Sequence, residues 1–90
     1  MSLLEKKVIV QNKMGLHARP AALFVKIANK FNSSVIVKCG ENEVDGKSML
    51  GMLMLGAGHG IPIIIKTDGP DAQIALNELE KLLLREEEYE

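Results

Sequence analysis

The sequence contains one cysteine, one tyrosine, two phenylalanines and no tryptophan. A single cysteine cannot form an internal disulfide, so we expect packing to hold the fold and the location to be reducing and cytoplasmic. RNA-binding modules stack bases on aromatic side chains that a sheet exposes. Here Phe24 and Phe31 fall on a helical stripe and Tyr89 lies in the last residues, which argues against such a module.

Neither sign of charge predominates. The formal net charge is −1, which argues against binding of nucleic acid through a positively charged surface. No basic segment followed by an apolar run opens the sequence, and no apolar run approaches the length of about 20 residues that a membrane span requires. We therefore expect neither a secretory leader nor direct insertion into a membrane.

The composition is that of a globular protein, with 47% hydrophobic and 26% charged residues. Ninety residues suffice for one small core, and no linker or repeat divides the chain, so we expect a single domain over residues 1–90. The acidic run at 86–90 is expected to be a solvated, frayed helix end.

Hydrophobic periodicity predicts the element order β-α-β-β-α-β-α. The expected strands cover residues 4–10, 35–39, 43–45 and 61–67, and the expected helices cover 18 to about 32, 49–55 and a last segment that opens with Gly69, Pro70 and Asp71. Pro70 should take the first position of this last helix, and Asp71 should favour the helix dipole. Its buried stripe should comprise Ala72, Ala75, Leu76, Leu79, Leu82 and Leu83.

This element order indicates an α+β fold in which helices cover one face of a sheet and the other face meets water. Ile61, Ile63 and Ile65 should share one face of the fourth strand. Pro62 should place the beginning of that strand at an edge or outside the ladder. Periodicity does not determine the strand order, and a ferredoxin-like plait would give nearly the same pattern.

Residues 15–21, with the sequence Gly-Leu-His-Ala-Arg-Pro-Ala, join the first strand to the first helix. Pro20 fits the first turn of a helix, where its missing N–H is tolerated, and this makes His17 the expected N-cap. The amides of Ala18 and Arg19 then open the helix, whose dipole makes this end an anion site. The guanidinium of Arg19 adds donors that suit phosphate oxygens.

An imidazole in that position can attack an electrophile, and the backbone and Arg19 can hold the anionic adduct. These residues alone indicate that His17 carries a phosphoryl group as phosphohistidine. A plain capping or turn role for His17 is the alternative that they leave open.

The second predicted helix, Met-Leu-Gly-Met-Leu-Met-Leu at 49–55, has no charged side chain, and Ser48 before it is a natural N-cap. A small domain cannot easily bury every side of such a helix. Some of the Met and Leu side chains should therefore face solvent as a docking patch for several partners, the alternative being that all of them are core.

The glycine-rich stretch 56–60 lacks the lysine–serine pair of a P-loop and is expected to be a helix stop and turn. His59 within it should be a solvated turn residue, and Cys39 a small packed side chain at a strand end. A metal site made from His17, His59 and Cys39 would need ligands from three separate segments without a spacing motif. We expect neither a metal nor an organic cofactor.

Residues 15–21, together with the sequence Lys-Ser-Met-Leu-Gly at 47–51, resemble the HPr family, the histidine-containing phosphocarrier proteins of the bacterial phosphotransferase system. The resemblance covers essentially the whole chain and implies an open-faced β-sandwich with antiparallel strand order 1-4-2-3 and helices on one face. It implies that His17 accepts a phosphoryl group on Nδ1 from phosphorylated Enzyme I, with help from Arg19. His17 would then pass the group to the IIA domains of sugar permeases, which makes the protein a relay rather than a free-standing enzyme.

The same resemblance implies a regulatory role for Ser48. This residue matches the serine that HPr kinase/phosphorylase phosphorylates in Gram-positive-type members, and the catabolite repressor CcpA binds that form. The alternatives are a plain N-cap at Ser48, or a nitrogen-type or catabolite-repression paralogue that acts by protein binding. The presence of His17 argues against paralogues in which the histidine is replaced. Several members carry a small polar residue where this chain has Met14, so here we expect the backbone to contact the phosphate.

Docking to two partners in turn requires a shallow, exposed His17 on a convex surface made by the first two helices, and a small, transient contact with each partner. We expect a monomer. The predicted partner contacts are Leu16, Ala22, Val25, Lys26, Met49, Leu50, Leu53 and Gly56.

Overall fold

A computed structural model of the chain describes residues 2–85. Its elements follow the predicted order: β1 (Ser2–Ile9), α1 (Ala18–Ala28), β2 (Ser34–Cys39), β3 (Asn42–Asp45), α2 (Met49–Met54), β4 (Pro62–Gly69) and α3 (Ala72–Leu83). The four strands form one antiparallel sheet in the order β1-β4-β2-β3, as the resemblance implied.

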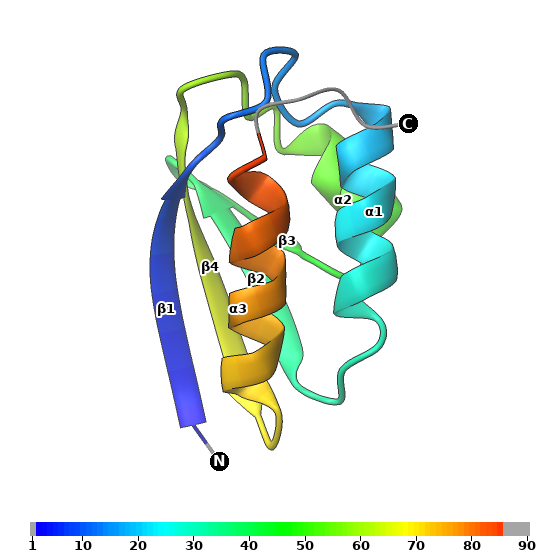
Figure 1. The fold of residues 1–90 in the computed structure, drawn as a ribbon, viewed down its shortest axis with the longest axis vertical. Coiled ribbons are helices and arrows are strands. Elements are labelled where there is room, and N and C mark those ends of the chain that lie inside the picture. Colours follow the sequence, from blue (N-terminus) through cyan, green and yellow to red (C-terminus); the bar gives the residue numbers. More distant parts are fainter. Residues whose placement is uncertain (1, 86–90) are drawn as a thin grey trace.

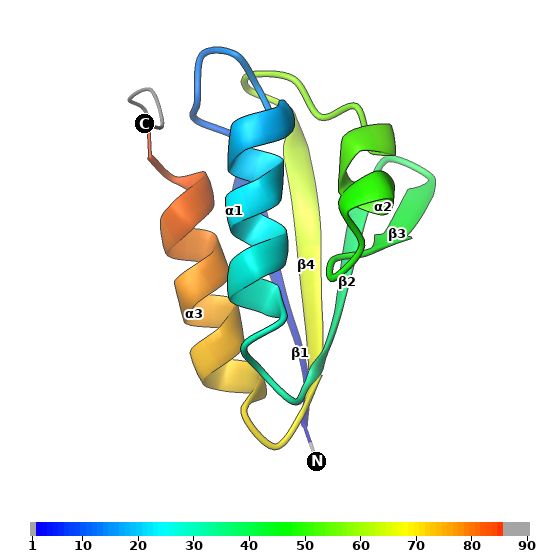
Figure 2. The same cartoon turned by 90° about the vertical axis from the view of Figure 1, so that its right-hand side faces the viewer.

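The three helices lie on one face of this sheet, and the opposite face is uncovered (Figures 1 and 2). α1 and α3 run antiparallel and side by side, and α3 packs on β1 and β4. α2 packs beside α1 and against β3. The beginning of α1, the end of α2 and the end of α3 therefore meet at one end of the molecule.

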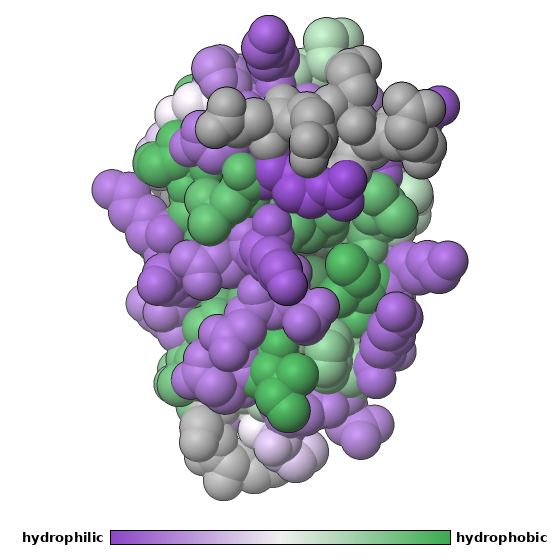
Figure 3. Space-filling model, viewed as in Figure 1, coloured by the Kyte–Doolittle hydropathy of each residue, from purple (hydrophilic) through white to green (hydrophobic). Residues whose placement is uncertain are grey.

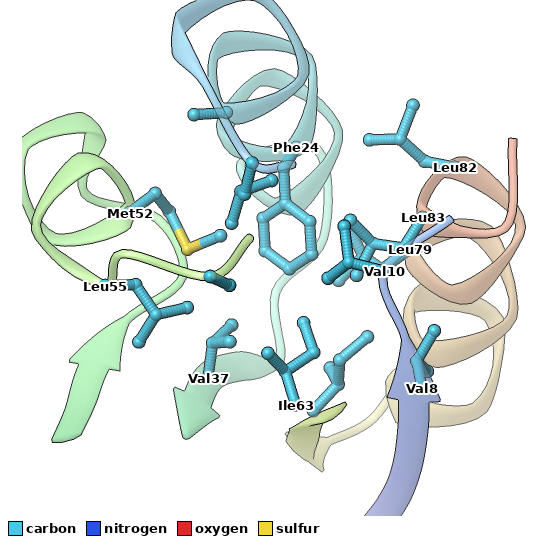
Figure 4. Close-up of a cluster of buried hydrophobic side chains, with 14 of the residues drawn as sticks. Val8, Val10, Phe24, Val37, Met52, Leu55, Ile63, Leu79, Leu82 and Leu83 are labelled. Carbon is cyan, nitrogen blue, oxygen red and sulfur yellow. The ribbon is translucent and has the colours of Figure 1, made fainter. Parts of the chain in front are cut away.

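The core between the helices and the sheet is apolar and centred on Phe24 of α1 (Figure 4). Met52 and Leu55 approach this ring from the α2 side, and Leu79 approaches it from α3. The outer side of α1 and α3 shows separate hydrophobic areas among mostly hydrophilic residues (Figure 3). The alternation of buried and exposed positions along β4 confirms that one face of the sheet is turned to the core.

The predicted stripe of α3 is confirmed, since all six of its residues are buried. The predicted position of Pro70 is wrong. α3 begins at Ala72 with Asp71 as its N-cap, so Pro70 lies in the turn before the helix. The carboxylate of Asp71 accepts hydrogen bonds from the backbone N–H groups of Asn32 and Ser33 and from the Ser33 hydroxyl, at 3.0, 2.9 and 2.6 Å. These bonds hold the turn before β2 against the beginning of α3.

Two other boundaries differ from the prediction. α1 ends at Ala28, because the side-chain amide of Asn29 donates to the carbonyl of Val25 and the next amides form i→i−3 bonds. Ile61 is 40% exposed and does not share the buried face of Ile63 and Ile65. Its N–H donates to the carbonyl of Gly58, which places Ile61 in the turn that precedes β4.

Pro62 stands at the first position of β4, where it pairs with Ile9 of β1. Pairing with β2 begins two residues later, at Ile64. One side of the strand is therefore open at Pro62, and this explains how a central strand can begin with a residue that lacks an N–H.

Candidate functional site

His17 is the N-cap of α1, as predicted, with an extended backbone at φ −92° and ψ −168°. The first helical hydrogen bond runs from the N–H of Ala21 to the carbonyl of His17, at 3.0 Å. Pro20 is therefore in the first turn, where its missing N–H leaves no helical bond unmade. The amide of Ala18 precedes the helical ladder and lies at the positive end of the helix dipole.

The loop that carries His17 is held by the loop that follows α2. The N–H of Leu16 donates to the carbonyl of Ala57 at 2.8 Å. Gly15 has φ +73°, and a Cβ at this position would lie 2.8 Å from the Cα of Gly58. This close approach requires glycine, because any side chain would displace one loop from the other.

Asn12 is a supporting residue that our sequence analysis missed. It is buried, its side-chain carbonyl accepts from the N–H of Met14 at 2.9 Å, and its backbone carbonyl accepts from the N–H of Gly15 at 2.9 Å. An asparagine three residues before a glycine is a turn signal that the sequence does contain. The turn places Gly15 and His17 before the helix begins.

The His17 side chain is half-buried and makes no capping hydrogen bond. Its Nε2 atom is shielded from solvent and has no hydrogen-bond partner. Among the side chains of residues 3–85 this is the one nitrogen or oxygen atom in that condition. Buried polar atoms in folded proteins are rarely left unpaired. A capping hydrogen bond does not account for this side chain, and Nδ1, the other ring nitrogen, is not among the buried atoms without a partner.

The surroundings of His17 favour an anion. Ala18 and Arg19 are exposed, and the first turn of α1 contains no acidic side chain. The helix dipole therefore favours an anion at this end of α1, and Arg19 places a positively charged residue in the same turn. This arrangement can stabilise a phosphoryl group bonded to the imidazole.

Ser48 is the N-cap of α2, and its hydroxyl oxygen accepts from the N–H of Gly51 at 3.0 Å. The segment before it is tied to the far end of α1. The Lys47 ammonium donates to the carbonyl of Phe31 at 2.8 Å, and the side-chain amide of Asn29 donates to the carbonyl of Lys47 at 3.2 Å. Ser48 is half-buried.

The exposed residues of α2 confirm that part of this apolar helix faces solvent. Leu50 and Leu53 are 68% and 44% exposed, whereas Met52 is fully buried. Of the other predicted contacts, Ala22, Lys26 and Gly56 are exposed, and Val25 and Met49 are half-buried.

Leu16 differs from the prediction of an exposed partner contact. It is 7% exposed and belongs to the core, because the bond from its amide to Ala57 draws the loop inward. The sequence analysis did not include Met14 and Met54 among the contacts, although they are 66% and 71% exposed. We define the candidate docking surface, called the docking surface below, as the exposed residues Ala22 and Lys26 of α1, Leu50, Leu53 and Met54 of α2, and Met14.

Cys39 is half-buried and His59 is exposed. Within residues 2–85, no group of three or more His, Cys, Asp or Glu side chains could hold a metal ion. In the same range, no helix has both the length and the apolar character that crossing a membrane requires.

Comparison with known proteins agrees with this site. Residues 4–85 match the family model described as the PTS HPr component phosphorylation site. The phosphocarrier protein HPr of Cupriavidus necator is 40% identical over 81 residues, which cover 90% of this chain and 91% of the relative. The HPr-like protein Crh of Halalkalibacterium halodurans is 43% identical over 77 residues, which cover 86% of this chain and 92% of the relative.

The fold agrees equally well. A crystal structure of a phosphocarrier protein HPr from Bacillus anthracis superposes with a TM-score of 0.88 at 40% identity, covering 92% of this chain and 99% of the other. The antiparallel sheet in the order β1-β4-β2-β3 with helices on one face is the fold that this chain shares with that HPr structure. The chain belongs to the HPr family of the bacterial phosphotransferase system.

Proposed function

We propose that this protein accepts a phosphoryl group from phosphorylated Enzyme I on His17 and passes it to the IIA domains of sugar permeases. We further propose that it acts in the cytoplasm as a monomer. The observation that carries this proposal is the state of the His17 ring at the α1 N-terminus. The ring caps nothing and has Nε2 shielded, so Nδ1 is the nitrogen available to a donor.

In the first transfer, the lone pair of Nδ1 attacks the phosphorus in line with the donor nitrogen, whose bond to phosphorus breaks. The charge on the equatorial oxygens is held by the N-terminal end of α1 and by Arg19. In the second transfer the acceptor attacks the same phosphorus, and the Nδ1–phosphorus bond breaks. Neither step requires a deep cleft, because both partners must reach the same atom in turn.

We propose that Ser48 is a second phosphorylation site, used for regulation by an HPr kinase/phosphorylase. A phosphate on an N-cap side chain lies at the favourable end of the helix dipole. It adds about two negative charges next to the exposed leucines of α2. This charge would repel an acidic partner at the docking surface. The phosphate group itself would be a new group for a CcpA-type repressor to bind.

A second candidate function is that of a regulatory paralogue which acts by protein binding. The observation that favours it is the 43% identity to an HPr-like protein Crh, similar to the identity with carrier proteins. His17 supports the carrier function, because this nucleophilic residue type stands at the N-terminus of α1 and its side chain makes no capping hydrogen bond.

The experiment is incubation with phosphoenolpyruvate and Enzyme I, followed by intact-protein mass measurement. We expect a gain of one phosphate that is lost on acid treatment. A His17→Ala variant should gain none, and a His59→Ala variant should behave as the unchanged protein, because His59 is an exposed turn residue. An unmodified mass with a competent Enzyme I would contradict the carrier function and leave the binding paralogue as the better account.

A further inference from the structure

Two of the three most exposed apolar side chains of the docking surface are thioethers. Met14 is 66% exposed and Met54 is 71% exposed, whereas Met52 is fully buried and Met49 is half-buried. A thioether is both apolar and oxidisable, and its conversion to a sulfoxide makes the side chain polar. The chain thus contains accessible and protected methionines in the same small region.

Met14 is held outward by the turn that precedes His17. Its N–H is bonded to the side chain of the buried Asn12, and the following Gly15 is pressed against Gly58. Neither contact involves the Met14 thioether. A sulfoxide on this side chain can therefore form without disturbing the turn, three residues before the imidazole.

Met54 lies on the exposed side of α2. It is four residues after Leu50, so the two side chains share one face of the helix. The next residue, Leu55, is buried, and Ala57 accepts the hydrogen bond from Leu16. The bond between Leu16 and Ala57 therefore joins the loop that contains Met14 to the loop that follows Met54. Met14 and Met54 both belong to the docking surface.

We propose that Met14 and Met54 are oxidation sites through which peroxide lowers the rate of phosphoryl transfer; this rests on the proposed carrier function. In each reaction the thioether sulfur attacks one oxygen of hydrogen peroxide, and the oxygen–oxygen bond breaks. Sulfur gains the oxygen and loses two electrons, and the peroxide is reduced to water. Methionine sulfoxide reductases reverse the change, so the modification can act as a switch.

We expect oxidation to weaken the docking of Enzyme I and to leave the reacting group, the His17 imidazole, unchanged. Each sulfoxide must give up water when a partner covers an apolar surface, which disfavours the complex. The KM of the oxidised protein as a substrate of Enzyme I should rise several-fold, and kcat should change less. The partner should in turn protect both methionines from peroxide while it is bound.

The test is brief treatment with hydrogen peroxide, removal of the peroxide with catalase, peptide mass mapping and measurement of phosphorylation by Enzyme I. We expect sulfoxide at Met14 and Met54 first, none at Met52 while the protein stays folded, and the rise in KM. Methionine sulfoxide reductases should restore the original KM. Unfolding curves before and after treatment show whether the fold is retained.

The matched variants are Met14→Leu with Met54→Leu, and Met52→Leu, each compared with its own untreated sample. The first should lose the response to peroxide, and the second should keep it. An unchanged KM with both sulfoxides present would overturn this inference. A full response in the double leucine variant would also overturn it and would point to Cys39 or another group. Absence of phosphorylation before any peroxide is added would instead contradict the carrier function, and with it the proposed switch.

Discussion

The N–H of Leu16 donates a hydrogen bond of 2.8 Å to the carbonyl of Ala57. This bond joins the residue before His17 to the loop that follows α2. Gly15 and Gly58 touch beside it, with no space for a Cβ between them. The beginning of α1 at His17 and the end of α2 are therefore positioned by one pair of loops rather than independently.

Replacing Gly15 by alanine should separate these loops. Alanine is disfavoured at φ +73°, and its Cβ would lie 2.8 Å from Gly58 and 2.9 Å from the Ala57 carbonyl oxygen. We expect a loss of about 3 kcal/mol in the free energy of unfolding and slower phosphorylation. Urea denaturation and the initial rate with Enzyme I measure these effects.

Gly40→Ala is the matched control. Gly40 also has a positive φ, +60°, but open space surrounds the position of its missing Cβ. We expect a loss of about 1–2 kcal/mol from backbone strain alone and an unchanged phosphorylation rate. Equal effects of the two substitutions on the rate would show that the contact between the loops does not position His17.

Substitutions at Leu50 and Met52 should separate effects on docking from effects on stability. Leu50→Ser should change the free energy of unfolding by about 0.5 kcal/mol or less, since this side chain is mostly exposed, and should raise the KM with Enzyme I. Met52→Ala should remove about 2–5 kcal/mol of stability, because Met52 fills the core between α2 and Phe24. A Leu50→Ser protein with an unchanged KM would remove the exposed side of α2 from the docking surface.

Ser48→Ala should destabilise α2 whether or not Ser48 is ever phosphorylated. The substitution leaves the N–H of Gly51 without the acceptor that it has at 3.0 Å. The expected loss is about 1 kcal/mol, and Ser48→Asp should recover most of it because aspartate is also a good N-cap. Thermal unfolding of the three proteins measures this. Equal stability of the Ser48→Ala protein and the unchanged protein would show that the capping hydrogen bond contributes no net stability.

Asp71 should make the free energy of unfolding depend on pH in the acid range. Hydrogen bonds, first from the Ser33 hydroxyl and then from the Asn32 amide, lower the pKa of its carboxyl group in the folded state. Its contribution is thus fully present above the unfolded pKa of about 3.9 and is lost as the pH falls through the lowered folded value.

An Asp71→Asn variant tests this dependence. It should be less stable than the unchanged protein at pH 7, and the difference should shrink once the pH falls below about 4. Urea denaturation at several pH values measures the difference. A difference that stays constant down to strongly acid pH would show that the charge of Asp71 contributes nothing.

Much of the fold was predictable because its signals are local. The spacing of the apolar residues in α3 predicted all six buried side chains, and Pro20 with its neighbours predicted the N-cap at His17. The strand order required the family resemblance, because strand pairing joins segments distant in the sequence and periodicity contains no information about it.

The errors arose where distant residues decide the local structure. Leu16 follows a glycine and precedes the histidine, but its burial depends on the bond to Ala57. Asp71 became an N-cap because its carboxylate is bonded to the turn at Ser33, and Pro70 was thereby displaced into the preceding turn. The exposure of Met54 depends on how α2 lies against α1 and β3, which no pattern within α2 reveals.

Nuclear magnetic resonance of the phosphorylated protein, with nitrogen-15 in the histidine rings, tests the central claim most directly. The structure shields Nε2 of His17, and we therefore expect phosphorus to be bonded to Nδ1 of that ring. The account predicts a phosphorus–nitrogen coupling at Nδ1 of His17 and an unmodified His59 ring. Phosphorus on Nε2, on His59 or on neither ring would contradict it.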